Sequence, residues 1–201
     1  MSFLPKGTKI PSTSNYLSKI PVGETTFRAL APAITGYEYF NTENKPVRSK
    51  DGWDEMPEDI GSKDGKLNQI KYFWAFPIYN HDEERIQIAQ FSQKTILTPL
   101  EALINNGRWG NPMDYDITIK RTGTTMNDTE YSVVPNPKEK VSDEILKKFH
   151  ARNLDINLLY EGIDPFNVAP SKGRTVQASG LPEGVEAPSK EEEELANSIP
   201  F

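Results

Sequence analysis

Aromatic and basic side chains alternate at several places along the chain. Aromatic rings can stack on nucleic-acid bases while Lys and Arg neutralise phosphates, and this combination is typical of proteins that bind single strands without reading their sequence. The candidate residues are Arg28, Tyr37, Tyr39, Lys45, Arg48, Lys71, Tyr72, Trp74, Lys94, Arg108, Trp109, Lys120 and Arg121.

Some aromatic residues of these segments are expected to line the core instead. On a strand, positions 72, 74 and 76 share one face and positions 71, 73 and 75 share the other. One set must line the core, and the sequence leaves open which. We expect Phe73, Phe76 and Phe91 to be core residues, whereas Trp109 follows Arg108 in a glycine-flanked loop and is a candidate for exposure.

The last twenty residues combine negative charge with an apolar end. From Pro182 to Phe201 there are six glutamates and one lysine, and the final residues are Ile199, Pro200 and Phe201. A terminal Phe offers a ring and an α-carboxylate, which a partner can capture with an apolar pocket beside a basic residue. We therefore expect these three residues to bind a partner protein. The alternative is an acidic segment that only solubilises the chain.

Charge and size limit the remaining possibilities. The net charge is −6 over 201 residues, but the acidity is concentrated at the end, so the rest is nearly neutral and can carry a basic groove. No apolar run approaches the ~20 residues of a membrane span, and the first residues lack the apolar stretch of a secretory signal. We expect one core domain in the cytoplasm.

Enzyme and metal motifs are weak. The chain has no cysteine and two distant histidines, so no cofactor or metal is expected. Asp114 and Asp116 could share a strand face and hold Mg²⁺, and Glu43-Asn44-Lys45 has the spacing of some metal-dependent nucleases. Such pairs are frequent by chance in a chain that is 26% charged. We expect no catalytic activity.

The pattern of residues predicts a mainly β domain with a few helices. The expected strands are Thr25–Leu30, Ile34–Phe40, Ile70–Tyr79, Arg85–Phe91, Tyr115–Arg121 and Thr129–Val134. We expect 41–66 to form a long hairpin loop. Pro77 implies an edge strand or a bulge, and Pro135 and Pro137 are expected to end the β region.

Three helical segments are expected. Thr98 is a predicted N-cap, followed by Pro99 at the first helical position and Glu101 in a capping box, with Gly107 ending this helix. A second helix is expected over 141–151 with Ser142 as its cap, and a short helical stretch over 155–160.

These elements predict three regions. Residues 1–22 would form an extended basic arm, 23–167 the folded domain, and 168–201 a disordered acidic segment, because its composition cannot bury enough apolar surface. Five to six antiparallel strands with one inserted helix and peripheral C-terminal helices are the pattern of an OB-fold barrel. An irregular α+β sandwich fits the pattern nearly as well.

Two parts of the chain resemble known single-stranded-DNA-binding proteins. The acidic end with Ile-Pro-Phe resembles that of the bacterial proteins, and the centre is similar to phage-encoded ones. The central stretches are Ile34–Phe40 (ITGYEYF), Asn44–Arg48 (NKPVR), Tyr72–Pro77 (YFWAFP), Gln93–Ile96 (QKTI) and Gly110–Ile117 (GNPMDYDI). Some phage helix-destabilising proteins hold a zinc in this fold, and the absence of cysteine excludes that site here.

The resemblance implies an OB fold that coats single-stranded DNA during phage replication or recombination in the host cytoplasm. Replication or recombination proteins would bind the acidic end, and a homo-oligomer is possible. Two other functions stay open at this point: a module for protein interactions, such as a virion accessory protein, and a Mg²⁺-dependent nuclease.

Overall fold

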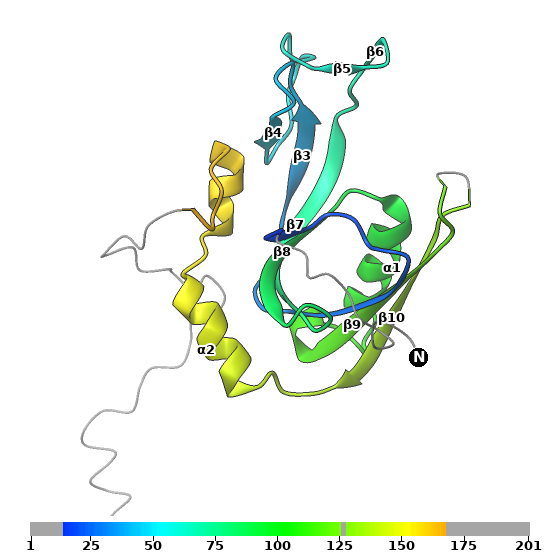
Figure 1. Ribbon diagram of the computed structural model, residues 1–201, viewed down its shortest axis with the longest axis vertical. Coiled ribbons are helices and arrows are strands. Elements are labelled where there is room, and N and C mark those ends of the chain that lie inside the picture. The colour runs from blue at the N-terminus through cyan, green and yellow to red at the C-terminus, as the bar shows by residue number, and fades with distance from the viewer. Residues whose placement is uncertain (1–13, 126–127, 168–201) are drawn as a thin grey trace, which may run out of the picture. The chain divides into compact units, whose positions relative to one another are not determined.

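A computed structural model describes residues 14–125 and 128–167, which are mainly β as predicted (Figure 1). The strands are β1 (Tyr16–Leu17), β2 (Gly23–Ala29), β3 (Ile34–Phe40), β4 (Pro46–Ser49), β5 (Ser62–Lys63), β6 (Lys66–Leu67), β7 (Lys71–Asn80), β8 (Arg85–Phe91), β9 (Tyr115–Thr122) and β10 (Glu130–Lys138). The helices are α1 (Lys94–Ile104), α2 (Asp143–Arg152) and the 3₁₀ turns η1 (Pro112–Asp114) and η2 (Ile156–Glu161). The predicted disordered segment, with Ile199, Pro200 and Phe201, lies outside the described residues, as do residues 1–13 of the predicted arm.

The main sheet has eight strands, more than the five or six expected. Six of them follow the order β1-β8-β7-β2-β9-β10, and β3 and β4 join through β7. The sheet is mixed, because β1 is parallel to β8 whereas the other pairs are antiparallel. Strands β5 and β6 form a separate two-stranded sheet.

Strand β7 belongs to two parts of the molecule. Its first half, 71–75, pairs with β3, and its last residues, 78–80, pair with β2. The strand therefore runs from the body of the domain into an extension formed by β3, β4, β5, β6 and the first half of β7 (Figure 1).

The prediction that Pro77 marks an edge or a bulge is wrong, because β7 is an inner strand paired with β8 through Pro77 and Ile88. Pro77 lies where the other neighbour of β7 changes from β3 to β2. Its carbonyl accepts a hydrogen bond from the N–H of Leu30 at 2.9 Å. The N–H that proline lacks would point to this same side, so pairing with β8 loses no hydrogen bond.

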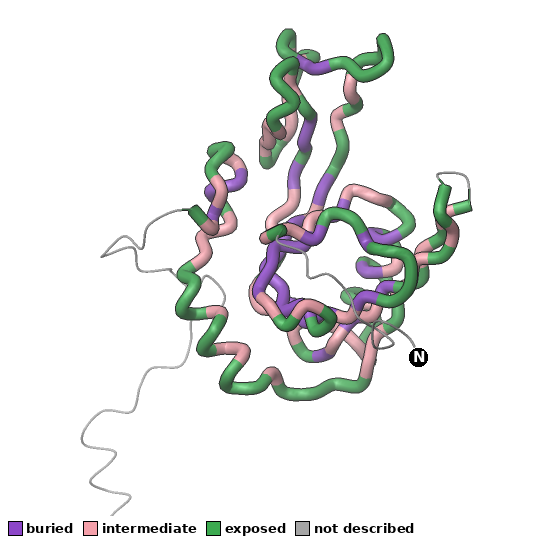
Figure 2. The backbone as a smooth tube through the Cα atoms, in the orientation of Figure 1, coloured by how far each residue is buried: buried purple, intermediate pink, exposed green. Residues whose placement is uncertain are grey.

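The main core fills the body of the domain. It is built on large apolar side chains of the sheet and α1, including the fully buried Phe27 and Phe91 and the nearly buried Phe76. A second cluster joins Phe73 and other β7 and β8 residues to Leu159 of η2. The core predictions for Phe73, Phe76 and Phe91 are thus confirmed. Figure 2 shows buried backbone concentrated in the body and exposed backbone over most of the extension.

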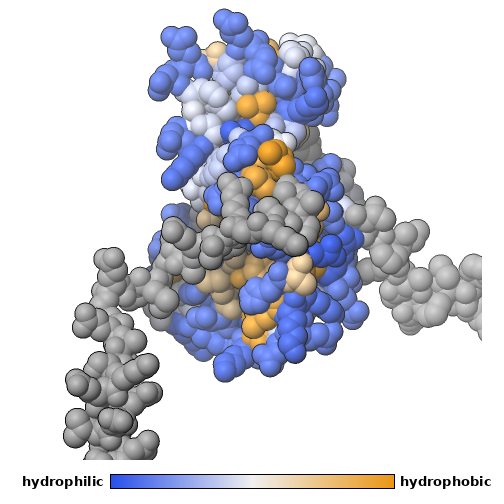
Figure 3. Space-filling view, turned by 90° about the vertical axis from the view of Figure 1, so that its left-hand side faces the viewer, coloured by the Kyte–Doolittle hydropathy of each residue, from blue (hydrophilic) through white to orange (hydrophobic). Residues whose placement is uncertain are grey.

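Hydrophobic residues do not form one large exposed area on the face shown in Figure 3. They lie there in separate groups among hydrophilic residues. Within the described ranges, no helix is both long enough and apolar enough to cross a bilayer.

Helix α1 begins earlier than predicted. Its N-cap is Gln93, which makes no side-chain capping bond, and Pro99 lies inside the helix. The predicted start at Thr98 missed the burial of Ile96 and Leu97 on the core, which favours helix in the preceding turn. An interior proline removes one hydrogen bond, and this cost is offset by that burial.

The predicted end of α1 at Gly107 is also wrong. The helix ends at Ile104 with Asn105 as its C-cap. Gly110 adopts the left-handed conformation instead, with a φ of +65°. Its N–H donates to the carbonyls of Leu103 and Asn106, at 3.2 and 2.9 Å. A glycine satisfies the end of this segment, but three residues later than the sequence suggested.

Two further boundaries differ. Strand β10 continues through Pro135 to Lys138, because it is an edge strand and its register shifts between Pro135 and Lys138. The predicted loop 41–66 contains β4 and β5, and β4 pairs with β3.

The helix predicted over 141–151 is α2, whose cap Ser142 accepts from the N–H of Ile145 at 3.4 Å.

The described part of the predicted arm belongs to the folded domain. Strand β1 pairs with β8, and Leu17 and Ile20 are buried in the main core. The carbonyl of Ile20 accepts a hydrogen bond from the Arg121 side chain at 3.0 Å. Residues 14–22 are therefore part of the folded domain.

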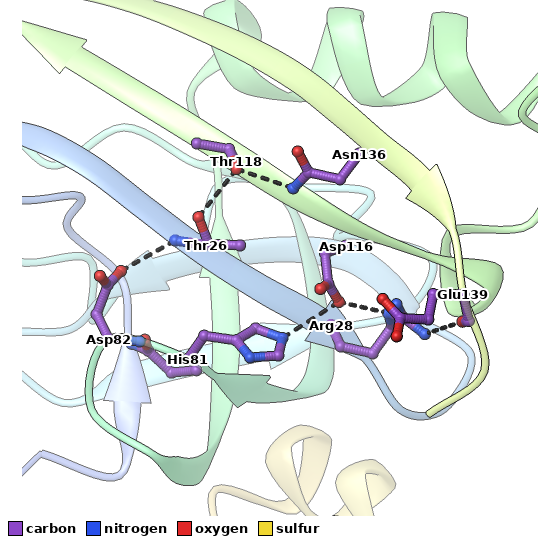
Figure 4. Close-up of polar contacts among 9 residues, drawn as sticks. Thr26, Arg28, His81, Asp82, Asp116, Thr118, Asn136 and Glu139 are labelled. Carbon is purple, nitrogen blue, oxygen red and sulfur yellow. Dashed lines mark hydrogen bonds and ion pairs between the residues drawn. The ribbon is translucent and has the colours of Figure 1, made fainter. Parts of the chain in front are cut away.

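Arg28 fixes strand β2 to β9 and to the segment after β10 (Figure 4). It is 3% exposed, and its Nε donates to Asp116 Oδ1 at 2.6 Å while its Nη1 donates to the Glu139 carbonyl at 2.7 Å. His81 Nε2 lies 3.2 Å from the same Asp116 oxygen. A buried guanidinium with both partners in place stabilises the fold, whereas removal of one partner leaves an uncompensated charge.

Tyr39 and the loop after β4 form a second polar contact, in the extension. Tyr39 is 4% exposed, its ring lies 4.9 Å from that of Trp53, and its hydroxyl donates to Asp59 Oδ1 at 2.6 Å. Burial, followed by the bond to Asp59, raises the pKa of Tyr39 to about 12. Only the neutral phenol can donate this bond, so Tyr39 holds the loop against β3 below that pH.

We predict that Arg28→Ala lowers the free energy of unfolding by about 3 kcal/mol, because Asp116 loses its main partner. Urea denaturation followed by circular dichroism measures this. The control is Lys120→Ala, since the exposed Lys120 lies 3.7 Å from Glu24 and such surface pairs contribute little. Equal small effects of the two substitutions would contradict the structural role of Arg28.

We also predict that the protein loses stability as the pH rises from 10 to about 12. The pKa of Tyr39 is higher in the folded chain than its ordinary value of 10.0, so its contribution is complete below pH 10 and is lost as it ionises. Tyr39→Phe should make this loss smaller and cost about 1 kcal/mol at neutral pH. Urea midpoints at pH 8 and pH 11 test both effects, with the exposed Tyr72→Phe as control.

Candidate nucleic-acid interface

Tyr37 and Tyr72 form an exposed aromatic pair on the extension. They lie directly opposite each other on the antiparallel strands β3 and β7. Their ring centroids are 5.3 Å apart in an edge-to-face arrangement. The residues are 39% and 44% exposed, so both rings offer surface to a ligand.

The aromatic surface continues along β7. Trp74 lies opposite Thr35 of β3, on the same face as Tyr72, and is partly buried against the main core. Phe76 is next on this face and is only 6% exposed. Side chains thus pass from exposed to partly buried to buried along one strand. We call Tyr37, Tyr72 and Trp74 the aromatic row.

The other face of β7 is buried as well. Phe73 and Ala75 are both 0% exposed, and they lie in the second cluster with Ile88 and Leu159. The sequence left open which set of β7 side chains lines the core, and the structure buries members of both sets. Both sets bury residues toward the body, and only the end of the strand at Lys71 and Tyr72 is exposed.

A small apolar pocket adjoins the aromatic row. It has a volume of about 100 Å³. Its lining comes from the end of β2, the β2–β3 connection, β7, α1, the segment before β9 and β9 itself. The lining residues are Ala29, Ala31, Pro32, Ala33, Trp74, Phe76, Leu100, Ile104, Asn111, Pro112, Met113 and Ile117. Trp74 therefore belongs both to the row and to the pocket.

Three predicted basic residues are exposed near these elements in the chain. Lys71 precedes Tyr72, and Lys94 is the first residue of the helix whose later turns line the pocket. Arg108 lies in the loop between the lining residues Ile104 and Asn111, and its guanidinium is 5.5 Å from the Trp109 ring centroid. These exposed charges are available to neutralise anionic groups of a ligand.

Trp109 is less available than its loop position suggested. It is partly buried against the main core, and its ring centroid lies 5.5 Å from that of Tyr115. Arg108 covers its other surface. We therefore assign Trp109 to the support of the loop that carries Arg108.

Four predicted residues are committed to the fold. Arg28 and Tyr39 make the buried contacts described above. Arg48 Nε lies 2.7 Å from Glu38 Oε2, with 9% of each side chain exposed, and Arg48 also donates to Gln90 at 3.0 Å. Arg121 donates to the Ile20 carbonyl and to Thr129. Their polar groups are used within the protein, so we leave them out of the interface.

Lys45 and Lys120 lie on the surface in ion pairs. Lys45 Nζ is 2.7 Å from Glu43, and hydrogen bonding to Glu43 with its charge raises the pKa of Lys45. Lys120 Nζ is 3.7 Å from Glu24. Both pairs are open to solvent, and neither residue is placed near the aromatic row by any contact we observe in the described residues.

The carboxylates considered for Mg²⁺ have other partners. Asp116 binds Arg28, and Asp114 Oδ2 lies 3.9 Å from Lys138 Nζ. Glu43 is paired with Lys45. In the part of the chain that the structure describes, no three His, Asp or Glu side chains come together in a way that could hold a metal ion.

The pocket residues were missed by the sequence analysis. Ala31, Pro32 and Ala33 carry neither charge nor an aromatic ring, and Pro112 and Met113 lie in what looked like a connecting segment. The sequence held one signal for these residues, namely two connections with small side chains, Ala or Pro, next to aromatic strands.

Comparison with protein-family models, with curated proteins and with solved structures finds no match to this chain, so the site has to be interpreted from its own geometry.

Proposed function

We propose that this protein binds single-stranded DNA without sequence preference, through an OB-type barrel whose aromatic row stacks on bases. The observation that carries the proposal is the exposed Tyr37–Tyr72 pair continuing into Trp74 on one face of β3 and β7. Two adjacent exposed rings offer a ligand an apolar surface, in addition to the stability that a cross-strand aromatic pair gives the sheet.

Stacking explains why sequence is not read. Every base has an apolar face, and the rings of the row offer contact area without a fixed pattern of donors and acceptors. Duplex DNA hides the base faces, so a surface of this kind favours unpaired strands. Lys71, Lys94 and Arg108 would contact the phosphates.

The OB-type barrel is supported by the order of the elements. Two hairpins, β7–β8 and β9–β10, flank β2 in the sheet, and α1 lies between them in the chain. A helix inserted between hairpins of one sheet is the arrangement expected of this fold. In that fold, ligands bind across a face of the sheet, and the aromatic row also lies on a sheet face.

The resemblance to phage proteins suggests the setting. The protein would coat exposed strands during replication or recombination in the host cytoplasm, remove hairpins and block nucleases. Ile199, Pro200 and Phe201 would bind replication or recombination proteins. The acidic end would also compete with DNA for the basic side chains. The described residues carry more acidic than basic groups, so few basic side chains are available to either of these negatively charged ligands.

We predict that Tyr72→Ala and Tyr37→Ala each weaken binding of oligo-dT about 5- to 100-fold, because each base loses a stacking partner. Fluorescence anisotropy of labelled oligo-dT at low salt measures the affinity.

Phe40→Ala is the matched control for this prediction. Phe40 is on the same strand as Tyr37 but on the opposite face, and it is 44% exposed, like Tyr72. Its loss should leave the affinity unchanged. Similar losses for Phe40→Ala and Tyr72→Ala would show that the affinity does not depend on this face.

We predict a steep fall in affinity as salt rises, because phosphate neutralisation releases counterions. A chain that lacks Pro182–Phe201 should bind oligo-dT more tightly at low salt and no longer recruit partner proteins. Titrations at two salt concentrations, with both chains, measure the effect. Equal affinities of the two chains would rule out competition by the acidic end.

A further inference from the structure

We propose that the pocket beside Trp74 receives one unstacked base of the bound strand, next to the base that stacks on Tyr37 and Tyr72. This inference rests on the proposed function and specifies it, since it names where consecutive nucleotides lie. The occupant is a neutral nucleobase held by apolar contact.

The spacing of the row supports separated bases. Alternate side chains on a strand are about 6.8 Å apart, because each residue rises about 3.4 Å. Bases stacked in a helical strand are also about 3.4 Å apart. Tyr72 and Trp74, which are alternate residues on one face of β7, therefore match neighbouring bases that are pulled apart. Each separated base then needs its own apolar surface, and the pocket is the next such surface beyond Trp74.

The lining of the pocket suits a base better than a phosphate. None of its lining residues is charged, and the one side-chain amide, Asn111, already accepts a hydrogen bond from the N–H of Met113 at 3.1 Å. A phosphate would be desolvated there without a counter-charge, which is costly. A flat, largely apolar base loses little water on entry.

The side chain of Trp74 gives a second reason to place a base in the pocket. Its indole Nε1–H is shielded from solvent and finds no acceptor among the described residues. A buried donor without a partner is costly, so a ligand that supplies an acceptor is favoured. Carbonyl oxygens on the rim of a base are suitable acceptors, and a small turn of the indole would present the donor to the pocket. Trp74 would then hold the base by its edge as well as by its ring.

One segment of the chain itself has similar chemistry. Ile199, Pro200 and Phe201 are apolar and could enter the same pocket. The experiment has to separate this occupant from a base, and a variant that fills the pocket does so, because the two occupants predict opposite changes in DNA affinity.

The test compares two alanine substitutions in the full chain. Ala33→Leu places a larger side chain in the pocket lining, and Ala33 is exposed, so the fold should accept it. Ala102→Leu adds the same atoms at an exposed position of α1 that does not line the pocket. We expect Ala33→Leu to weaken oligo-dT binding at least about fivefold and Ala102→Leu to have no effect.

Photocrosslinking locates the base directly. Oligo-dT that carries one 4-thiothymidine should crosslink to the peptide containing Pro112 and Met113, and Ala33→Leu should remove this product. Crosslinks confined to the peptides of Tyr37 and Tyr72, with normal affinity of Ala33→Leu, would overturn the pocket site and leave the proposed function standing. Tighter binding by Ala33→Leu would assign the pocket to the chain's own end. Failure of the unaltered protein to bind oligo-dT would overturn both proposals.

Discussion

The alternation of side chains along β7 is the constraint on which the candidate interface depends. A strand sends successive side chains to opposite faces, so the residues that follow Phe76 outward on its face are Trp74 and then Tyr72. Burial of Phe76 in the main core sets the face of β7 on which it lies, and Trp74 and Tyr72 lie on that same face. Pairing with β3 then places Tyr37 opposite Tyr72. A slip of one residue would bury the row and expose Phe73.

The basic side chains of the domain fall into two groups. Arg28, Arg48 and Arg121 donate to carboxylate, amide or carbonyl groups of the protein itself. Lys71, Lys94 and Arg108 are exposed. This division explains why a basic residue beside an aromatic one in the sequence is a poor guide to nucleic-acid contact. Many such basic side chains pair with polar groups of the protein itself.

Much of the fold could be predicted from local patterns, and the pocket could not. The β-forming composition of 34–40 and the alternation of 85–91 predicted β3 and β8 with the bounds that the structure has, whereas α1 was misplaced because burial of Ile96 and Leu97 outweighed the capping signal at Thr98. Exposure of Tyr72 and burial of Tyr39 depend on which loop covers them. That is a long-range property of the folded chain, and so is the meeting of several distant segments that forms the pocket.

The two prolines of β10 have a consequence for molecules that assemble side by side. The unpaired N–H groups of an edge strand can form hydrogen bonds with a strand of a neighbouring copy, and such pairing leads to aggregation. Pro135 and Pro137 have no N–H to donate, and the register shifts between Pro135 and Lys138. This part of β10 is therefore a poor template for a strand of a second copy, and copies bound side by side as proposed would keep separate sheets.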